Sequence, residues 1–327
     1  MQCDVPTTCL TIKAHHRRRC YGMKTRQAMD NALGGFLRMA LGGHRGLPKG
    51  ESAAVKARVK AMLNIGEKLH ADLARAPAKR KHDGLTSPEF EEWRDVIMAS
   101  LAARAPFDAI DKAAKKRMAK LAAELPVWAA FAEGVRGFGA VSLAVIVGEA
   151  GDLAAYPKKG HLWKRMGLAV LDGVRQGGLR KSANKDDWIE HGYNAERRSK
   201  MFVIGDVLVK TQGFYRDYYL ARKEIERGKA VAAGLTVAPS AKIPKARAAE
   251  FMADGHIHRR AQRAMEKRLL KDIHQAWREA DRRVGDKPIG TIPPAATDDP
   301  EGGQSDVVDM AFRAPPPSGS ASSPEAG

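Results

Sequence analysis

Residues 128–153 read WAAFAEGVRGFGAVSLAVIVGEAGDL, and this stretch decides the fold that we expect. A short apolar helix is predicted to end just before Gly137-Phe138-Gly139, and a second helix is predicted to begin at Ala140. Glycine suits both turn positions because it adopts positive φ without a Cβ clash. Phe138 is expected to tuck under the turn, and the small Ala144 to let two helices approach closely. The pattern is that of a helix-hairpin-helix.

Such a turn leaves backbone N–H groups uncovered beside the positive end of the second helix. Together these donors can hold a phosphate oxygen without reading any base. The alternative is an ordinary tight turn between two buried helices. A lone Gly-hydrophobe-Gly does not decide between them, so the charge of the chain has to be considered.

The chain has 327 residues, with 56 Lys and Arg against 38 Asp and Glu, a formal net charge of +18 and a pI near 9.9. The charge is uneven, because residues 284–327 carry seven acids and two bases and the remainder therefore holds +23. Such an excess favours a polyanionic partner with strongly salt-dependent affinity. We expect that partner to be a nucleic acid. A merely soluble basic protein is the remaining interpretation.

Composition divides the chain into four parts. Residues 1–22 hold all three cysteines and little periodicity, and are expected to be an unstructured leader, either preceding a natural start at Met23 or acting as a flexible basic arm. Residues 23–125 are predicted to be a helical region, with helices starting at Ser87-Pro88 and at Pro106. Residues 126–283 form the expected binding domain, in which one helix is predicted from Ala195 to Lys210. Residues 284–327, rich in Pro, Gly, Ser and Asp, are predicted to be a disordered acidic tail. The fold class is mainly α.

The sequence shows no signal peptide, and its most apolar stretch, 141–147, is far too short to span a bilayer. The region after residue 22 lacks cysteine, which suits a reducing compartment. We therefore expect a soluble, cytoplasmic protein with no membrane partner.

A basic helix follows His256-Ile257-His258, with arginines and lysines on one side and apolar residues on the other. A solvated face and a phosphate-tracking stripe are equally good interpretations of that side. The residues predicted to contact DNA phosphates are Gly137, Phe138, Gly139, Ala140, Lys158, Lys159, Lys164, Arg165, Arg260, Arg263 and Lys267.

Metal sites are poorly supported. Asp186-Asp187 with Glu190 and His191 are better explained as a polar loop before a helix. His256 and His258 are two residues apart, so on a helix they point to nearly opposite faces. No metal or cofactor is assigned, and Mg²⁺ is expected only if the protein is catalytically active.

The stretch 137–178 resembles the C-terminal domain of the DEDD-type insertion-sequence transposases. The shared steps, in order, are the Gly137-x-Gly139 hairpin, an acid-x-Gly-Asp step at 149–152, an aromatic-Pro-basic step at 156–158 and the apolar-Gly-Leu step at 166–168. Further likeness is found at 192–198 and 214–223, so the resemblance covers roughly residues 130–280, and 137–168 is its most specific part.

The resemblance implies a DNA-binding protein acting in transposition or recombination. The chain departs from the family in two respects. It shows no N-terminal ribonuclease-H-like domain with acidic metal ligands, and the catalytic serine step is replaced by Arg175-Gln176-Gly177-Gly178, with Ser182 at the wrong spacing. The first hypothesis is therefore DNA binding without catalysis. The others are an active recombinase with unrecognised residues, which a partner chain in a homo-oligomer could supply, and a non-enzymatic RNA-binding or structural protein of phage or mobile-element origin.

Overall fold

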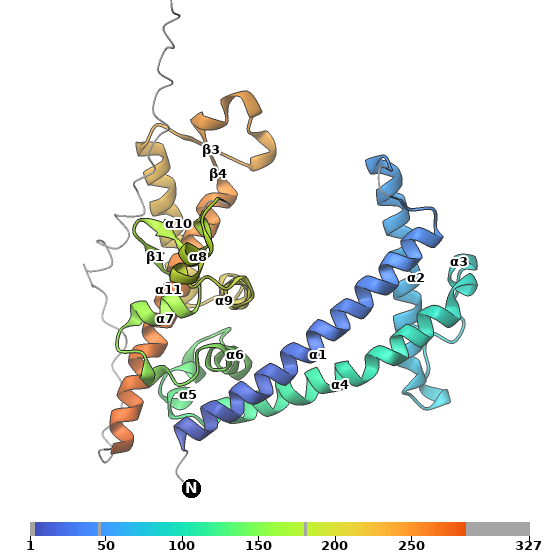
Figure 1. The fold of residues 1–327 in the computed structure, drawn as a ribbon, viewed down its shortest axis with the longest axis horizontal. Helices are drawn as coiled ribbons and strands as arrows, with labels where there is room; N and C mark the ends of the chain where they lie inside the picture. Colours follow the sequence, from blue (N-terminus) through green and yellow to red (C-terminus); the bar gives the residue numbers. More distant parts are fainter. Residues whose placement is uncertain (1–3, 45–46, 180–181, 286–327) are drawn as a thin grey trace, which may run out of the picture. The chain divides into compact units, whose positions relative to one another are not determined.

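The computed structural model describes residues 4–44, 47–179 and 182–285, and these are mainly helical (Figure 1), as the sequence predicts. The chain forms two compact units that divide between Ala123 and Glu124. We call residues 4–123 the N-terminal unit and residues 124–285 the C-terminal unit. No helix within the described residues is both long enough and apolar enough to cross a membrane.

The N-terminal unit contains three long helices. Its elements are α1 (Val5–Ala40), α2 (Lys49–Leu73), the 3-10 helix η1 (Pro77–Lys79), α3 (Pro88–Glu92) and α4 (Arg94–Ala123). The helices α1 and α4 lie side by side along most of their length (Figure 1). Their core with α2 and α3 is built from Leu33, Leu37, Val59, Met62, Leu69, Phe90, Ile97 and Leu101.

The prediction of an unstructured leader over residues 1–22 is wrong for its described part. Asp4 caps α1, accepting a hydrogen bond from the Thr7 N–H at 3.4 Å, and the helix then continues through Gly22. The physical reason is tertiary: Arg19 Nε lies 3.0 Å from Asp111 Oδ1 of α4. A Cβ at Gly22 would lie 2.9 Å from the carbonyl oxygen of Phe107, so this glycine allows the two helices to approach closely. Packing against α4 therefore orders a segment whose own periodicity is weak.

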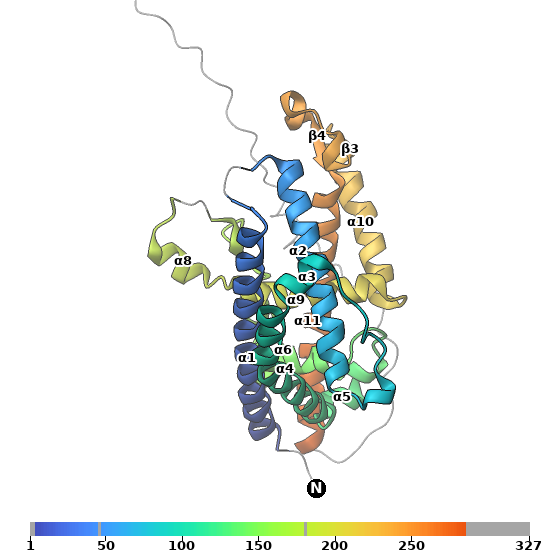
Figure 2. The ribbon, with the colours of Figure 1, turned by 90° about the vertical axis from the view of Figure 1, so that its right-hand side faces the viewer.

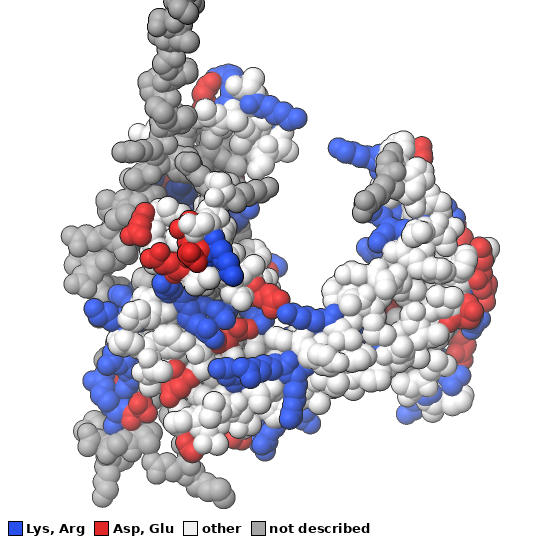
Figure 3. All heavy atoms as spheres, in the orientation of Figure 1, with Lys and Arg blue, Asp and Glu red and all other residues white. Residues whose placement is uncertain are grey.

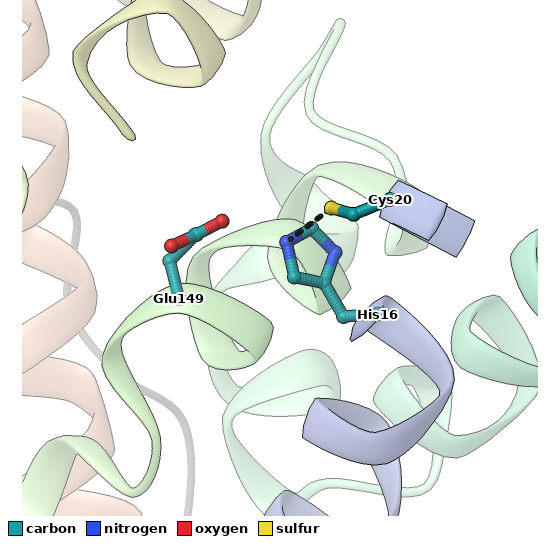
Figure 4. Close-up of side chains that lie close together, drawn as sticks. All are labelled: His16, Cys20 and Glu149. Carbon is teal, nitrogen blue, oxygen red and sulfur yellow. Dashed lines mark hydrogen bonds between the residues drawn. The ribbon is translucent and has the colours of Figure 1, made fainter. Parts of the chain in front are cut away.

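Both described cysteines belong to α1. Cys9 is buried, and the Sγ of Cys20 lies 3.6 Å from Nε2 of His16, one helical turn away (Figure 4). His16 is itself 3% exposed. These thiols are thus part of a packed helix and not of a solvated arm.

Local signals place the other helix ends with mixed success. Ser87 caps α3 as predicted, its Oγ accepting a hydrogen bond from the Phe90 N–H at 3.2 Å. Pro106, expected to open a helix, lies inside α4 instead. Since a proline removes one intrahelical hydrogen bond, the continuity of α4 depends on its long pairing with α1.

The C-terminal unit is built around its last helix. Its helices are α5 (Pro126–Ala130), η2 (Ala132–Gly134), α6 (Ala140–Ala150), η3 (Leu153–Ala155), α7 (Lys159–Arg165), η4 (Gln176–Gly178), α8 (Lys185–His191), α9 (Ala195–Lys210), α10 (Phe214–Ala232), η5 (Ser240–Lys242), η6 (Lys245–Glu250) and α11 (Asp254–Gly285). α11 packs against α5, η3, α7, α9 and α10, whereas α8 stands apart from it (Figure 2).

α11 is more buried than its sequence suggests. The predicted apolar side is buried at Ile257, Ala261, Met265, Leu269, Ile273 and Trp277. Buried residues outside that side are Gln262, Glu266, Leu270, His274, Ala276 and Ala280. Neighbours therefore cover most of the helix circumference, and several of its basic residues are themselves half-buried: Arg260, Arg263, Lys267, Arg268 and Lys271.

Two small two-stranded sheets complete the unit. β1 (Val170–Leu171) pairs antiparallel with β2 (Val174–Arg175), and β3 (Thr236–Ala238) pairs parallel with β4 (Phe251–Ala253). Asp172 and Gly173 join β1 to β2 with φ of +49° and +76°, as a tight hairpin turn with two positive φ angles requires. The predicted acidic tail lies outside the described residues apart from its first two positions, which continue α11.

Candidate nucleic-acid interface

The turn at Gly137-Phe138-Gly139 joins two short helices to α6. The first helix does not continue to the turn as predicted, because α5 ends at Ala130 and the chain then makes the single 3-10 turn η2 before it reverses at Gly137, whose φ is +86°. Phe138 donates its N–H to the Val135 carbonyl at 3.0 Å, and its side chain is 2% exposed, as expected. The second helix begins at Ala140, where the sequence places it.

The two glycines of this turn have different roles. Gly139 is the N-cap of α6 with φ −79°, so the expectation of positive φ is wrong there, because its backbone is extended. An added Cβ at Gly139 would meet nothing within 4 Å. At Gly137 the same atom would lie 2.8 Å from the Cβ of Thr211 at the end of α9. Gly137 therefore serves the packing of α9 as well as the turn, while Gly139 stands at an open helix start.

Two lysines that were predicted to contact phosphate, Lys159 of α7 and Lys267 of α11, are distant in the sequence but lie close to the ring of Trp163. We call these three residues the lysine–tryptophan platform. The Lys159 Nζ lies 5.8 Å and the Lys267 Nζ 5.3 Å from the centre of the Trp163 ring. The Trp163 Nε1–H donates to the Lys267 carbonyl at 3.0 Å, which fixes the indole against α11. The fold thus brings together two predicted lysines that are far apart in the sequence. Figure 3 shows Lys and Arg side chains gathered over this part of the C-terminal unit.

Other predicted contacts have structural partners. Arg165 donates from Nε to the Glu149 carbonyl at 2.9 Å, and so holds the end of α6. Arg260 pairs with the buried Glu226 at 3.5 Å. Lys164 is half-buried, and its carbonyl accepts a hydrogen bond from Gln176 at 2.9 Å. Lys158, the residue before α7, is exposed. Of these four, Arg165 and Arg260 are the least available to a ligand.

A pocket that the sequence did not predict lies between β2, α9 and α11. Its volume is about 180 Å³, and three arginines, Arg175, Arg198 and Arg263, belong to its lining. The rest of the lining comes from Gly167-Leu168-Ala169, Gln176-Gly177 and Tyr193. Only Arg263 was predicted as a phosphate contact. We call this cavity the arginine pocket.

The buried side chain of Gln176 holds the wall of the arginine pocket. Its Oε1 accepts from the Ala169 N–H at 3.0 Å, and its Nε2 donates to the carbonyls of Lys164 (2.9 Å) and His191 (2.6 Å). Gly177 gives the Tyr193 ring its place, because an added Cβ would lie 2.9 Å from that ring. One glutamine therefore ties three backbone segments together behind the arginines.

Arg198 is held from behind by a buried acid. Its Nη1 lies 2.9 Å from Oε2 of Glu266, which is fully buried on α11. Burial raises the pKa of Glu266 to about 7, although the charges of Arg198 and Arg263 oppose that rise. At neutral pH the carboxyl therefore carries its negative charge only part of the time, and the arginine pocket keeps a net positive charge.

Positive charges also act on His256 at the start of α11. Burial, and then the neighbouring cations, lower the pKa of the exposed His256. The cations concerned are Arg259, Arg260, Arg175 and Arg263. These four arginines disfavour the protonated form of His256. The same positive charges would attract an anion to this region.

The prediction of a polar loop at residues 186–191 is wrong, because these residues belong to the helix α8. Asp187 forms a capping box with Asn184 at the start of α8, with distances of 2.8 and 3.1 Å. His258 Nδ1 lies 2.7 Å from the Tyr219 hydroxyl. Asp187 therefore serves a helix cap, and His258 belongs to a packed side-chain pair.

The arginine pocket could not have been located from the sequence. Gly167-Leu168, Tyr193 and Arg198 all belong to steps of the transposase resemblance, but nothing in their spacing shows that they meet.

Comparison of the chain with protein-family models, with curated proteins and with solved structures finds no match.

Proposed function

We propose that the protein binds DNA through its phosphate backbone, using the C-terminal unit, and that it acts in transposition or recombination without catalysis of its own. The lysine–tryptophan platform carries this proposal. Two ammonium groups from distant parts of the chain meet at one fixed indole, in a protein with an excess of 18 positive charges.

Lysine contacts of this kind position a nucleic acid and do not read its sequence. An ammonium group above an aromatic ring keeps N–H donors for phosphate oxygens, since the ring only attracts it electrostatically. The exposed start of α6 at Gly139 adds backbone donors of the type that bind phosphate. We therefore expect sequence-independent binding in which each phosphate contact releases counterions.

The place of this binding in transposition comes from the resemblance of 137–168 to the transposase C-terminal domain. The stretch 175–178, where that family carries its serine, contributes an arginine and a glutamine to the arginine pocket instead. Neither side chain is a nucleophile of the serine type, which supports binding over strand cleavage. Metal-dependent nicking of supercoiled DNA by the purified protein would contradict the non-catalytic part of the proposal.

The main test measures the affinity of the full chain for a duplex DNA between 50 and 200 mM salt, in ~50 mM steps. We expect log Kd to rise linearly with log salt concentration. The variant Lys159→Gln/Lys267→Gln should lower that slope by about 1 to 2, because each lost phosphate contact removes about 0.9 from it.

The matched control is Lys242→Gln/Lys245→Gln, which removes the same charge from exposed positions on the connection between β3 and β4. It should leave the slope close to that of the unchanged protein. An equal decrease of the salt slope in both variants would show only a general effect of net charge. Preferential binding of duplex RNA would favour the RNA-binding hypothesis, and absence of binding to either polymer at low salt would refute the proposal.

A further inference from the structure

The arginine pocket has the size of a site for a small group. Its volume of about 180 Å³ is smaller than the roughly 300 Å³ at which pockets for drug-sized ligands begin. A nucleotide does not fit within it, whereas a tetrahedral oxyanion with its water does. The pocket is open at the surface through Arg175 and Gly177, both of which are exposed.

Its lining is chemically one-sided. Three arginines belong to the lining, and no acidic residue does. Glu266, the partner of Arg198, is fully buried. Guanidinium groups present planar pairs of N–H donors that match phosphate oxygens, so three of them around one cavity specify an oxyanion better than a solvated charge would.

The pocket is also built before any ligand arrives. Gln176 holds the backbone at Ala169, Lys164 and His191, and Gly167 adopts φ +76° where a Cβ would lie 3.2 Å from the Cβ of Arg198. The Arg198 guanidinium is anchored by Glu266. A prebuilt cavity spares the ligand much of the entropy of ordering these side chains.

We infer that the arginine pocket binds one phosphate group, held by Arg175, Arg198 and Arg263. This site lies apart from the lysine–tryptophan platform in the residues that form it, and the inference rests on the proposed DNA binding only for the source of the phosphate. Phosphodiester groups of DNA and free phosphate share this chemistry, and the two arms of the test separate them.

The first arm titrates inorganic phosphate into the full chain at low salt and follows binding by calorimetry. We expect saturable binding that weakens about tenfold in Arg175→Gln, the value for one hydrogen bond to a charged group. Arg175 is exposed and lies at the pocket entrance, so its substitution should leave the melting temperature unchanged. Arg247→Gln, at an exposed arginine paired with Glu250, is the charge-matched control and should keep full phosphate affinity.

The second arm measures duplex DNA affinity in the same variants. A fall of about tenfold in Arg175→Gln but not in Arg247→Gln assigns the bound phosphate to DNA. If phosphate binding depends on Arg175 while no DNA binds at all, the pocket takes free phosphate and the proposed function fails instead.

The inference is overturned if Arg175→Gln and Arg247→Gln bind inorganic phosphate equally well, or if the unchanged protein binds none. In that case the salt dependence of DNA affinity in Lys159→Gln/Lys267→Gln would still test the proposed DNA binding independently. Arg175→Lys provides a further check, because it keeps the charge and loses the planar pair of donors. It should recover only part of the phosphate affinity.

Discussion

Gly137 lies so close to Thr211 that an added Cβ would be 2.8 Å from the Cβ of the threonine. Gly137 also has a φ of +86°, which side chains with a Cβ adopt only at a cost of about 1–2 kcal/mol. Gly137→Ala should therefore destabilise the C-terminal unit by at least that amount. Gly139→Ala, at φ −79° and with open space around it, should cost less than about 1 kcal/mol. Urea denaturation of the two variants measures the difference.

A double-mutant cycle separates the two causes at Gly137. In a Thr211→Gly background the steric part of the Gly137→Ala cost should disappear and the φ part remain. Equal costs in both backgrounds would mean that Thr211 yields to the new methyl group. Because Gly139→Ala leaves the fold intact, it is the better variant for testing the α6 start in DNA binding.

Trp163→Phe keeps an aromatic ring in the lysine–tryptophan platform and removes the hydrogen bond from Nε1 to the Lys267 carbonyl. We expect a loss of about 1 kcal/mol in the free energy of unfolding, the usual value of one neutral hydrogen bond. Trp163→Ala should cost more, because it removes the contact between α7 and α11. DNA affinity should follow the same order when measured at constant salt. A larger loss of affinity for Phe than for Ala would contradict the positioning role of the indole.

Glu266 should give the C-terminal unit an unusual pH dependence. Its native pKa of about 7 lies above the usual value for an unfolded glutamate, about 4.3, so the folded state binds the extra proton between these pH values. Its contribution to stability is therefore greatest below pH 4 and falls as pH rises to 7 and above. The loss is on the order of 3 kcal/mol in full.

Glu266→Gln cannot titrate and isolates this effect. Urea denaturation gives the free energy of unfolding of the unchanged protein and of Glu266→Gln. The value for the unchanged protein minus that for the variant should be larger at pH 5 than at pH 8. A difference that stays the same from pH 5 to pH 8 would contradict the raised pKa, because it would show that the ion pair with Arg198 keeps Glu266 ionised throughout this range.

Asp72 is expected to behave in the opposite way in the N-terminal unit. Burial favours its neutral form, but hydrogen bonds from the backbone N–H groups of Lys81 (2.8 Å) and His82 (2.7 Å), and from the His82 ring, lower the pKa of Asp72. A depressed native pKa means that its stabilising contribution is complete above pH 4 and is lost as pH falls through the native value. Asp72→Asn should therefore speed amide hydrogen exchange over residues 73–82 at pH 7. Asp83→Asn, a neighbouring exposed position, should not.

The helical class and several helix ends were predictable because they depend on local signals. Ala195–Lys210 forms α9 with the bounds that the sequence predicts, and Ser87 caps its helix through a short-range hydrogen bond. The ordering of residues 4–22 was not predictable, because it comes from pairing with α4 about 90 residues away. The arginine pocket escaped prediction for the same reason. Arg175, Arg198 and Arg263 meet only after β2, α9 and α11 are packed.

The central position of α11 has a consequence for synthesis on the ribosome. α5, η3, α7, α9 and α10 all pack against a helix that is translated after them. The N-terminal unit has its complete core once residue 123 has emerged, since its cluster ends at Leu101. The C-terminal unit has to wait, with apolar surfaces unpaired, until residues 254–285 arrive. A ribosome stalled before Asp254 would therefore hold one folded unit and one open, aggregation-prone chain, a natural client for a chaperone.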